Sequence, residues 1–152
     1  MPPRRLNRRL PTRKALAPIN VAVGAQVAAG MAAAWVALRV LPYPKVLRLF
    51  EPRIPPRTRA RAYRTRVLRA ASLIGPWMFG QKPCLPQALA TRWLLGRAGY
   101  PSTLRIGVST ERERDAALAH AWLEADGRII LGYMPGWRFL PFEPLRAPRP
   151  SV

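Results

Sequence analysis

Cysteine and histidine are almost absent from this chain of 152 residues, which has one of each, Cys84 and His120. A single cysteine excludes a disulfide within the chain and a zinc site built from several thiolates. It also fits a reducing compartment, so we expect a cytoplasmic protein without a metal or another cofactor. Acidic residues are scarce as well. The chain has seven aspartates and glutamates against 26 lysines and arginines, which gives a formal net charge of +19.

The positive charge is concentrated in the first half of the chain. Residues 1–70 hold sixteen lysines and arginines and one acid, whereas residues 71–152 hold ten and six. Such a field attracts nucleic acid, an anionic lipid surface or an acidic peptide. Nucleic acid is not expected, because the sequence has no recognised binding motif and its aromatic residues are not interleaved with the arginines. A basic binding module without catalysis is kept as an alternative function, and a solvated basic surface as the simplest interpretation of the charge.

The N-terminal part predicts an arm and a long helix. Residues 1–14 are basic and contain proline, which is typical of a disordered arm. Residues 15–38 carry no charge and are long enough to cross a bilayer. Alanine and glycine dominate this stretch, and Pro18 and Asn20 interrupt it. We therefore favour a buried helix over about residues 21–41, with membrane association or a cleaved signal peptide as less favoured alternatives.

Two further helices are predicted in the middle of the chain. A helical period runs over residues 59–74, after a proline-rich linker, and we expect Gly75-Pro76 to end it. The second helix, over residues 84–98, begins with Cys84. Pro86 falls in its first turn, where the missing N–H does no harm, and Gly99 follows as a C-terminal cap.

Strands follow these helices. Alternation of apolar and polar residues predicts three of them, over residues 103–109, 117–125 and 128–133. Asp126-Gly127 is a hairpin signal between the last two. The chain from Met134 onward has five prolines and predicts an irregular tail. Helices followed by an antiparallel meander predict an α+β domain in which the helix headed by Cys84 packs on a small antiparallel sheet.

Cys84 and His120 have the chemistry of a nucleophile and its base. A thiol at a helix start lies near unpaired N–H groups and the positive end of the helix dipole, which favour the thiolate. An imidazole on a neighbouring strand can take the thiol proton and later deliver it to a leaving amine. The backbone at Cys84 is a candidate oxyanion donor, and the side chain of Gln81 is another. The simpler alternatives are a small buried apolar residue and a hydrogen-bonded histidine.

Four segments in order carry a resemblance to a known family: 84–90 (CLPQALA), 94–101 (LLGRAGYP), 104–108 (LRIGV) and 119–127 (AHAWLEADG). Residues 38–43 (LRVLPY) resemble the end of the same family's N-terminal helix. Over about residues 39–140 the chain resembles the lasso-peptide biosynthesis leader-peptidase family, in its split, stand-alone form. That family belongs to the transglutaminase-like group of papain-type cysteine enzymes. The resemblance implies a transglutaminase-like core over residues 59–140. A helical segment and linker (15–58) precede this core, and a proline-rich tail (141–152) follows it.

The resemblance also implies a role. The chain would be a cysteine protease that removes the leader from a ribosomally made precursor peptide, with Cys84 as nucleophile and His120 as general base and acid. A small leader-recognition protein would present the leader, and an asparagine-synthetase-like cyclase would use the freed amine to form a macrolactam. Trp122 would wall the site, although plain core packing is the simpler interpretation. Another transglutaminase-like acyltransferase or amidase is the second alternative function.

The chain departs from the family at the residue that orients the histidine. The family often has an aspartate about a dozen residues after the histidine, where this chain has Gly132 and Tyr133. Asp126 lies roughly 20 Å from His120 along an extended strand, and Glu124 roughly 13 Å, so neither reaches the ring. A hairpin turning at Asp126 would place His120 opposite Tyr133. The candidates that stay open are the tyrosine hydroxyl, a backbone carbonyl or a loop acid, namely Glu111, Glu113 or Asp115.

Overall fold

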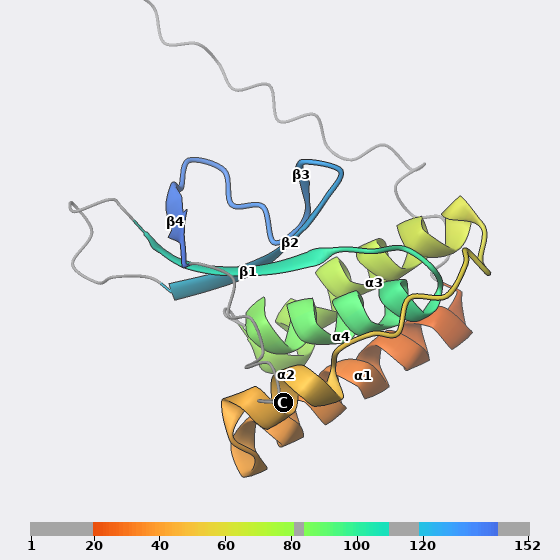
Figure 1. Cartoon of the computed structure of the whole chain (residues 1–152), viewed down its shortest axis with the longest axis horizontal. Coiled ribbons are helices and arrows are strands. Elements are labelled where there is room, and N and C mark those ends of the chain that lie inside the picture. The colour runs from red at the N-terminus through yellow and green to blue at the C-terminus, as the bar shows by residue number, and fades with distance from the viewer. Residues whose placement is uncertain (1–19, 81–83, 110–118, 143–152) are drawn as a thin grey trace, which may run out of the picture.

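A computed structural model describes residues 20–80, 84–109 and 119–142. Over these residues the chain forms four helices and an antiparallel sheet of four strands, which confirms the predicted α+β fold (Figure 1). The helix that begins with Cys84, α4 (Cys84–Arg97), lies at the centre. The sheet covers one side of α4, and the first two helices lie on the other side. Side chains are buried all around α4, because it has neighbours on several sides.

Helix α1 (Val21–Val40) forms where the sequence predicts a helix. Its first turn is capped by Asn20, whose side-chain oxygen accepts a hydrogen bond of 3.0 Å from the backbone N–H of Ala22. One face of α1 packs against α4 and α3 (Arg61–Phe79), while the opposite face is exposed although it is apolar. By length and composition α1 is the one described helix that could cross a membrane, and its buried face makes it part of the core.

Helix α2 (Tyr43–Leu49) follows α1 closely, and its Val46 packs against both α1 and α4. The linker that follows is held across the end of α4 by polar contacts. Glu51 forms a two-pronged ion pair with Arg92, with N···O distances of 2.7 and 2.9 Å. The Tyr100 hydroxyl donates a hydrogen bond of 2.7 Å to the carbonyl of Arg59. These contacts position the first turn of α3 next to the second half of α4.

The predicted stop of α3 at Gly75-Pro76 is wrong, because the helix continues to Phe79. Tertiary packing outweighs the local signal. A Cβ atom on Gly75 would lie only 3.0 Å from the side chains of both Gln87 and Met31, so α3 passes very close to α4 and α1 at this point. The Gln87 amide also donates a hydrogen bond of 2.8 Å to an α3 carbonyl, and the Phe79 ring stacks on α1. These contacts hold the last turn in place despite the missing proline N–H.

The sheet has four strands in the order β3 (Arg128–Leu131), β2 (Ala119–Ala125), β1 (Thr103–Ser109) and β4 (Phe139–Pro141). The predicted hairpin is present, and its turn residues Asp126 and Gly127 both have positive φ angles, 52° and 71°. Strand β3 (Arg128–Leu131) ends two residues before the predicted limit. Apolar residues of β2 and β3 pack on α4 and form the core with it.

The prediction of an irregular tail after Met134 is wrong for one segment. Strand β4 (Phe139–Pro141) pairs antiparallel with β1 at the edge of the sheet. A short edge strand tolerates proline, because one side of it makes no ladder bonds. The two strands approach so closely that a Cβ atom on Gly107 would overlap the Leu140 carbonyl. This addition brings the end of the described chain over the first residues of β2.

We expect Leu95→Ala to lower the free energy of unfolding by about 2–5 kcal/mol, because Leu95 is fully buried in the main core. Urea denaturation followed by circular dichroism measures the change. Leu73→Ala is the matched control, since Leu73 is 56% exposed and its truncation should change the stability by less than about 0.5 kcal/mol. Equal losses in both variants would show that the core is placed wrongly.

Candidate active site

Cys84 is the first residue of α4 and is partly buried. Burial by itself raises the pKa of its thiol. Hydrogen bonds from the His120 side chain and from the backbone at Ala121 and Leu85, together with the charge of His120, outweigh burial, so the pKa lies below the ordinary thiol value. The helix start and the imidazole thus act in the same direction, and both favour the thiolate.

His120 lies on β2, and its ring has two hydrogen-bonding partners, Gly132 and Cys84. Its Nε2 atom is 2.7 Å from the carbonyl oxygen of Gly132, just beyond the end of β3. A carbonyl oxygen only accepts hydrogen bonds, so Nε2 carries the proton and donates it. The neutral ring then has its lone pair on Nδ1, which is the nitrogen left for the thiol of Cys84. This tautomer is the one that a general base at Cys84 requires.

The environment of His120 also favours the charged ring. The hydrogen bond with Cys84 raises its pKa most strongly, burial lowers it, and the bond to Gly132 and the charge of Cys84 raise it further. The net pKa is above the ordinary imidazole value. A lowered thiol pKa beside a raised imidazole pKa favours a thiolate–imidazolium pair. Such a pair holds a nucleophile and a proton donor in contact.

The group that contacts the outer nitrogen of His120 is thus a backbone carbonyl, one of the candidates left open by the sequence. Tyr133 does not lie opposite His120, because a bulge between Leu123 and Glu124 shifts the β2–β3 register by one residue. The Tyr133 side chain is 70% exposed. The other candidates, Glu111, Glu113 and Asp115, lie outside the described residues, as does Gln81.

The two acids nearest in sequence to His120 have other partners. Glu124 accepts a hydrogen bond of 2.8 Å from the Trp122 indole and one of 3.2 Å from Arg105. Asp126 lies at the exposed hairpin turn, where one of its carboxylate oxygens is 4.0 Å from Arg64. Both acids thus have partners of their own, Glu124 within the sheet and Asp126 near its turn.

Two aromatic rings pack against the imidazole of His120. The Trp122 ring, two residues along β2, stacks on it with a centroid distance of 6.1 Å. The Phe139 ring lies 5.0 Å away and comes from β4, which pairs with the far edge of β1. Trp137 stacks on Phe139 at 6.1 Å. Sequence reasoning missed Phe139, because the strand that carries it was predicted to be irregular. The rings limit how far the imidazole can rotate away from Cys84.

The backbone at position 132 has a conformation and a close contact that only glycine allows. Its φ angle is 86°, and a Cβ atom would lie 3.0 Å from Trp122 Cβ and 3.1 Å from the Ala121 carbonyl oxygen. An L-residue is strained at this φ and has no room here. The glycine therefore lets the chain pass close to β2 and direct its carbonyl at His120.

We expect Gly132→Ala to reduce kcat about 10–100-fold with little change in KM, since it displaces the carbonyl that orients His120. Steady-state kinetics on a peptide substrate measures the effect. Gly136→Ala is the matched control, because Gly136 has a similar φ of 78° but no heavy atom within 4 Å of the added Cβ. Equal losses of kcat in both variants would show that backbone strain, and not the carbonyl, is responsible.

The pair supports acyl transfer through a covalent thioester. The thiolate can attack a carbonyl carbon, and the imidazolium can protonate the leaving group. Among the described residues there is no group of three or more histidines, cysteines, aspartates or glutamates placed to hold a metal ion.

Comparison with known proteins gives one finding. Residues 23–143, which include both Cys84 and His120, match the family model described as "Transglutaminase-like superfamily". No curated protein and no solved structure matches the chain significantly. The matched stretch extends from the first turn of α1 past β4, so the N-terminal helix is part of the family domain.

Proposed function

Since the chain belongs to the transglutaminase-like superfamily, we propose that it is a cysteine peptidase that removes the leader from a ribosomally made lasso-peptide precursor. The observation that supports the chemistry best is the contact between Cys84 at the start of α4 and His120, with Gly132 holding the far nitrogen of the ring. The precursor as substrate rests on the four sequence segments that resemble the leader-peptidase family.

The reaction has two halves. The Cys84 thiolate attacks the carbonyl carbon of the last leader residue, and the negative charge moves to the carbonyl oxygen, near the backbone N–H of Cys84. His120 then gives its Nδ1 proton to the amine of the core peptide, the C–N bond breaks, and a leader thioester remains on Cys84. Water attacks this thioester while His120 takes one of its protons. The leader leaves as a carboxylic acid, and Cys84 leaves the tetrahedral intermediate as a thiolate paired with the imidazolium.

We propose the same partners that the family resemblance implies. A small leader-recognition protein presents the precursor, and an asparagine-synthetase-like cyclase consumes the freed amine. The reaction takes place in the cytoplasm. An acyltransferase or amidase is the second candidate, because members of the superfamily form the same type of thioester and differ in whether water or an amine attacks it.

An isotope experiment tests the proposed hydrolysis. A lasso-type precursor peptide is incubated with the protein and the leader-recognition partner in water enriched in ¹⁸O. We expect one cut at the leader–core junction and one ¹⁸O atom in the new leader carboxyl group, read by mass spectrometry. Transfer of the leader to an added amine without ¹⁸O uptake would support the acyltransferase instead. Salt-sensitive binding of generic nucleic acid with no cleavage would support the basic binding module.

A further inference from the structure

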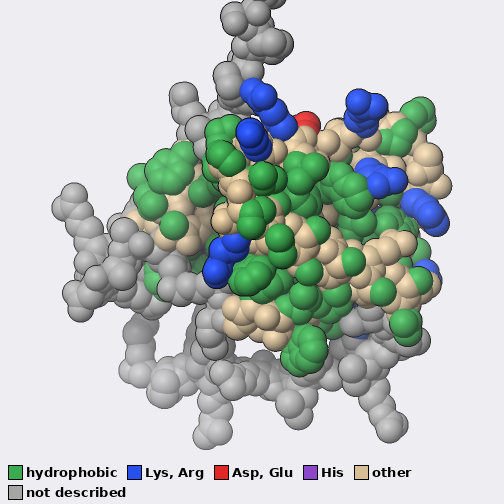
Figure 2. Space-filling model, turned by 90° about the horizontal axis from the view of Figure 1, so that it is seen from below, with side chains coloured by type: hydrophobic (Ala, Val, Ile, Leu, Met, Phe, Trp, Pro, Cys, Tyr) green, Lys and Arg blue, Asp and Glu red, His purple; other side chains and the backbone are tan. Residues whose placement is uncertain are grey.

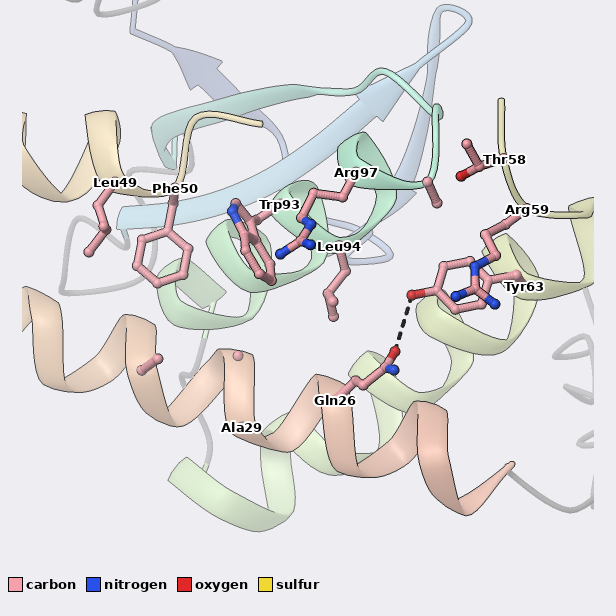
Figure 3. Close-up of a pocket in the computed structure, with 13 residues that line it drawn as sticks. Gln26, Ala29, Leu49, Phe50, Thr58, Arg59, Tyr63, Trp93, Leu94 and Arg97 are labelled. Carbon is pink, nitrogen blue, oxygen red and sulfur yellow. Dashed lines mark hydrogen bonds between the residues drawn. The ribbon is translucent and has the colours of Figure 1, made fainter. Parts of the chain in front are cut away.

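A groove of about 680 Å³ runs beside α1, lined by α1, the end of α2, the start of α3 and the second half of α4 (Figure 3). Its α4 residues begin at Trp93, which is roughly 14 Å along the helix axis from Cys84. The groove is therefore separate from the reactive pair. An inference about it does not depend on the proposed function.

The groove is apolar at one end and cationic toward the other. Leu49 and Phe50 lie at the apolar end, and Trp93 lies in the middle, where Arg97 covers its ring at 4.6 Å. Arg59 lies at the opposite end, beside Tyr63. Among the residues that line the groove there is no aspartate or glutamate. An occupant with a bulky apolar group and flanking negative charges fits this layout.

The exposed side of α1 continues the apolar surface. Val36 is 50% exposed and Val40 is 69% exposed. Hydrophobic side chains gather over the middle of this face, and lysine and arginine side chains lie around them (Figure 2). The wall that α1 contributes to the groove has three small residues, Ala29, Gly30 and Ala33, followed toward the Arg59 end by Gln26, whose side chain accepts a hydrogen bond of 3.3 Å from the Tyr63 hydroxyl (Figure 3). Small side chains bury little area in lipid, but they allow the backbone of another helix to approach closely.

The backbone of the occupant must satisfy its own hydrogen bonds. None of the described residues that line the groove belongs to a strand. The backbone N–H of Thr58, on the groove rim, already donates to the carbonyl of Ala98 at 3.2 Å. An extended peptide would therefore find no strand edge to pair with, whereas a helix needs none.

Charge decides between occupants. The stretch that precedes α1, residues 1–19, has six lysines and arginines and no acid, so its charge does not complement Arg59 and Arg97. A second copy of this chain carries the same large positive charge. We propose that the groove binds an amphipathic helix of an acidic partner protein. A bulky apolar side chain enters near Leu49 and Trp93, and carboxylates face the two arginines.

A pair of synthetic peptides of about twenty residues tests the proposal. Both peptides have leucine and phenylalanine on one helix face. The glutamate peptide has glutamates on either side of this face, and the lysine peptide has lysines at the same positions. Fluorescence anisotropy measures their binding to the full chain. The variant is Arg59→Glu/Arg97→Glu, and the matched control is Arg66→Glu/Arg128→Glu, which reverses two exposed charges outside the groove. Circular dichroism checks that both variants fold, and Ala33→Trp fills the groove without a change of charge.

We expect the glutamate peptide to bind the wild type and the control, and at least tenfold more weakly to Arg59→Glu/Arg97→Glu and to Ala33→Trp. The lysine peptide should bind at least tenfold more weakly to the wild type. Equal binding of the glutamate peptide to both double variants, or equal binding of both peptides to the wild type, would overturn the proposal. The proposal would also be overturned if the glutamate peptide failed to bind while the protein bound phosphatidylserine–phosphatidylcholine vesicles and Val36→Asp abolished that vesicle binding. The apolar face would then serve a membrane.

Discussion

Cys84→Ala is expected to abolish cleavage of the precursor, with kcat/KM reduced at least about 10⁴-fold. The thiolate is the only group in the proposed route that forms a bond to the substrate carbon, and the chain has no second cysteine. The oxyanion donor and His120 remain, but they have no intermediate to stabilise. Cleavage is followed by mass spectrometry with the leader-recognition partner present.

The loss must be chemical and not structural. Cys84 is the first residue of α4 and is only partly buried, so its truncation to alanine should leave the unfolding transition nearly unchanged. Cys84→Ser is the shape-conserving control: it should fold like the wild type and be severely impaired, since a serine hydroxyl has a far higher pKa than a thiol. A trapped leader thioester in the wild type must map to Cys84. Undiminished cleavage by Cys84→Ala would eliminate the proposed mechanism.

His120→Ala is expected to reduce kcat about 10²–10⁴-fold, because it removes both the base that forms the thiolate and the acid that protonates the leaving amine. The double variant with Cys84→Ala should be no slower than Cys84→Ala alone, since the two residues act as a unit. Phe139→Leu is the milder comparison. It keeps the imidazole and removes one ring beside it, so its loss should be much smaller than that of His120→Ala.

The pH dependence follows from the two pKa shifts. On the acid side, kcat/KM should rise as Cys84 loses its proton, at a pH below the ordinary thiol pKa. On the alkaline side it should fall as His120 loses its proton, at a pH above the ordinary imidazole pKa. The two limbs belong to the coupled pair and not to either residue alone. A profile with limbs at the ordinary values would contradict the contact between the two side chains.

Much of the fold follows from local pattern. The charge-free run gave the position of α1, and Cys84, Pro86 and Gly99 bracket α4 at nearly its observed ends. The alternation of apolar and polar residues in β1 and the turn at Asp126 could be predicted for the same reason, because each depends on residues that are neighbours in sequence. The break predicted at Pro76 failed because side chains from two other helices hold the last turn of α3.

The sequence could not predict how His120 is held. Phe139 reaches the ring through pairing between β4 and β1, which are far apart in the chain, and the bulge that moves Tyr133 out of register has no local signature. One signal was present. Gly107 inside a strand indicates close approach of another backbone, and that backbone is β4. Similarly, Gly132 stands near the position where the family resemblance implies an aspartate, and a glycine there indicates that the backbone, and not an acidic side chain, makes the contact with His120.

The most direct test of the Cys84–His120 pair needs no substrate. Cys84 is the only cysteine, so the rate of alkylation of the whole protein by iodoacetamide, followed by intact mass, reports its thiolate alone. Measured against pH, the wild type should react with a midpoint below the ordinary thiol pKa, and His120→Ala should shift the midpoint upward. Coincident curves for the two proteins, with a midpoint at or above the ordinary thiol value, would show that His120 does not activate Cys84.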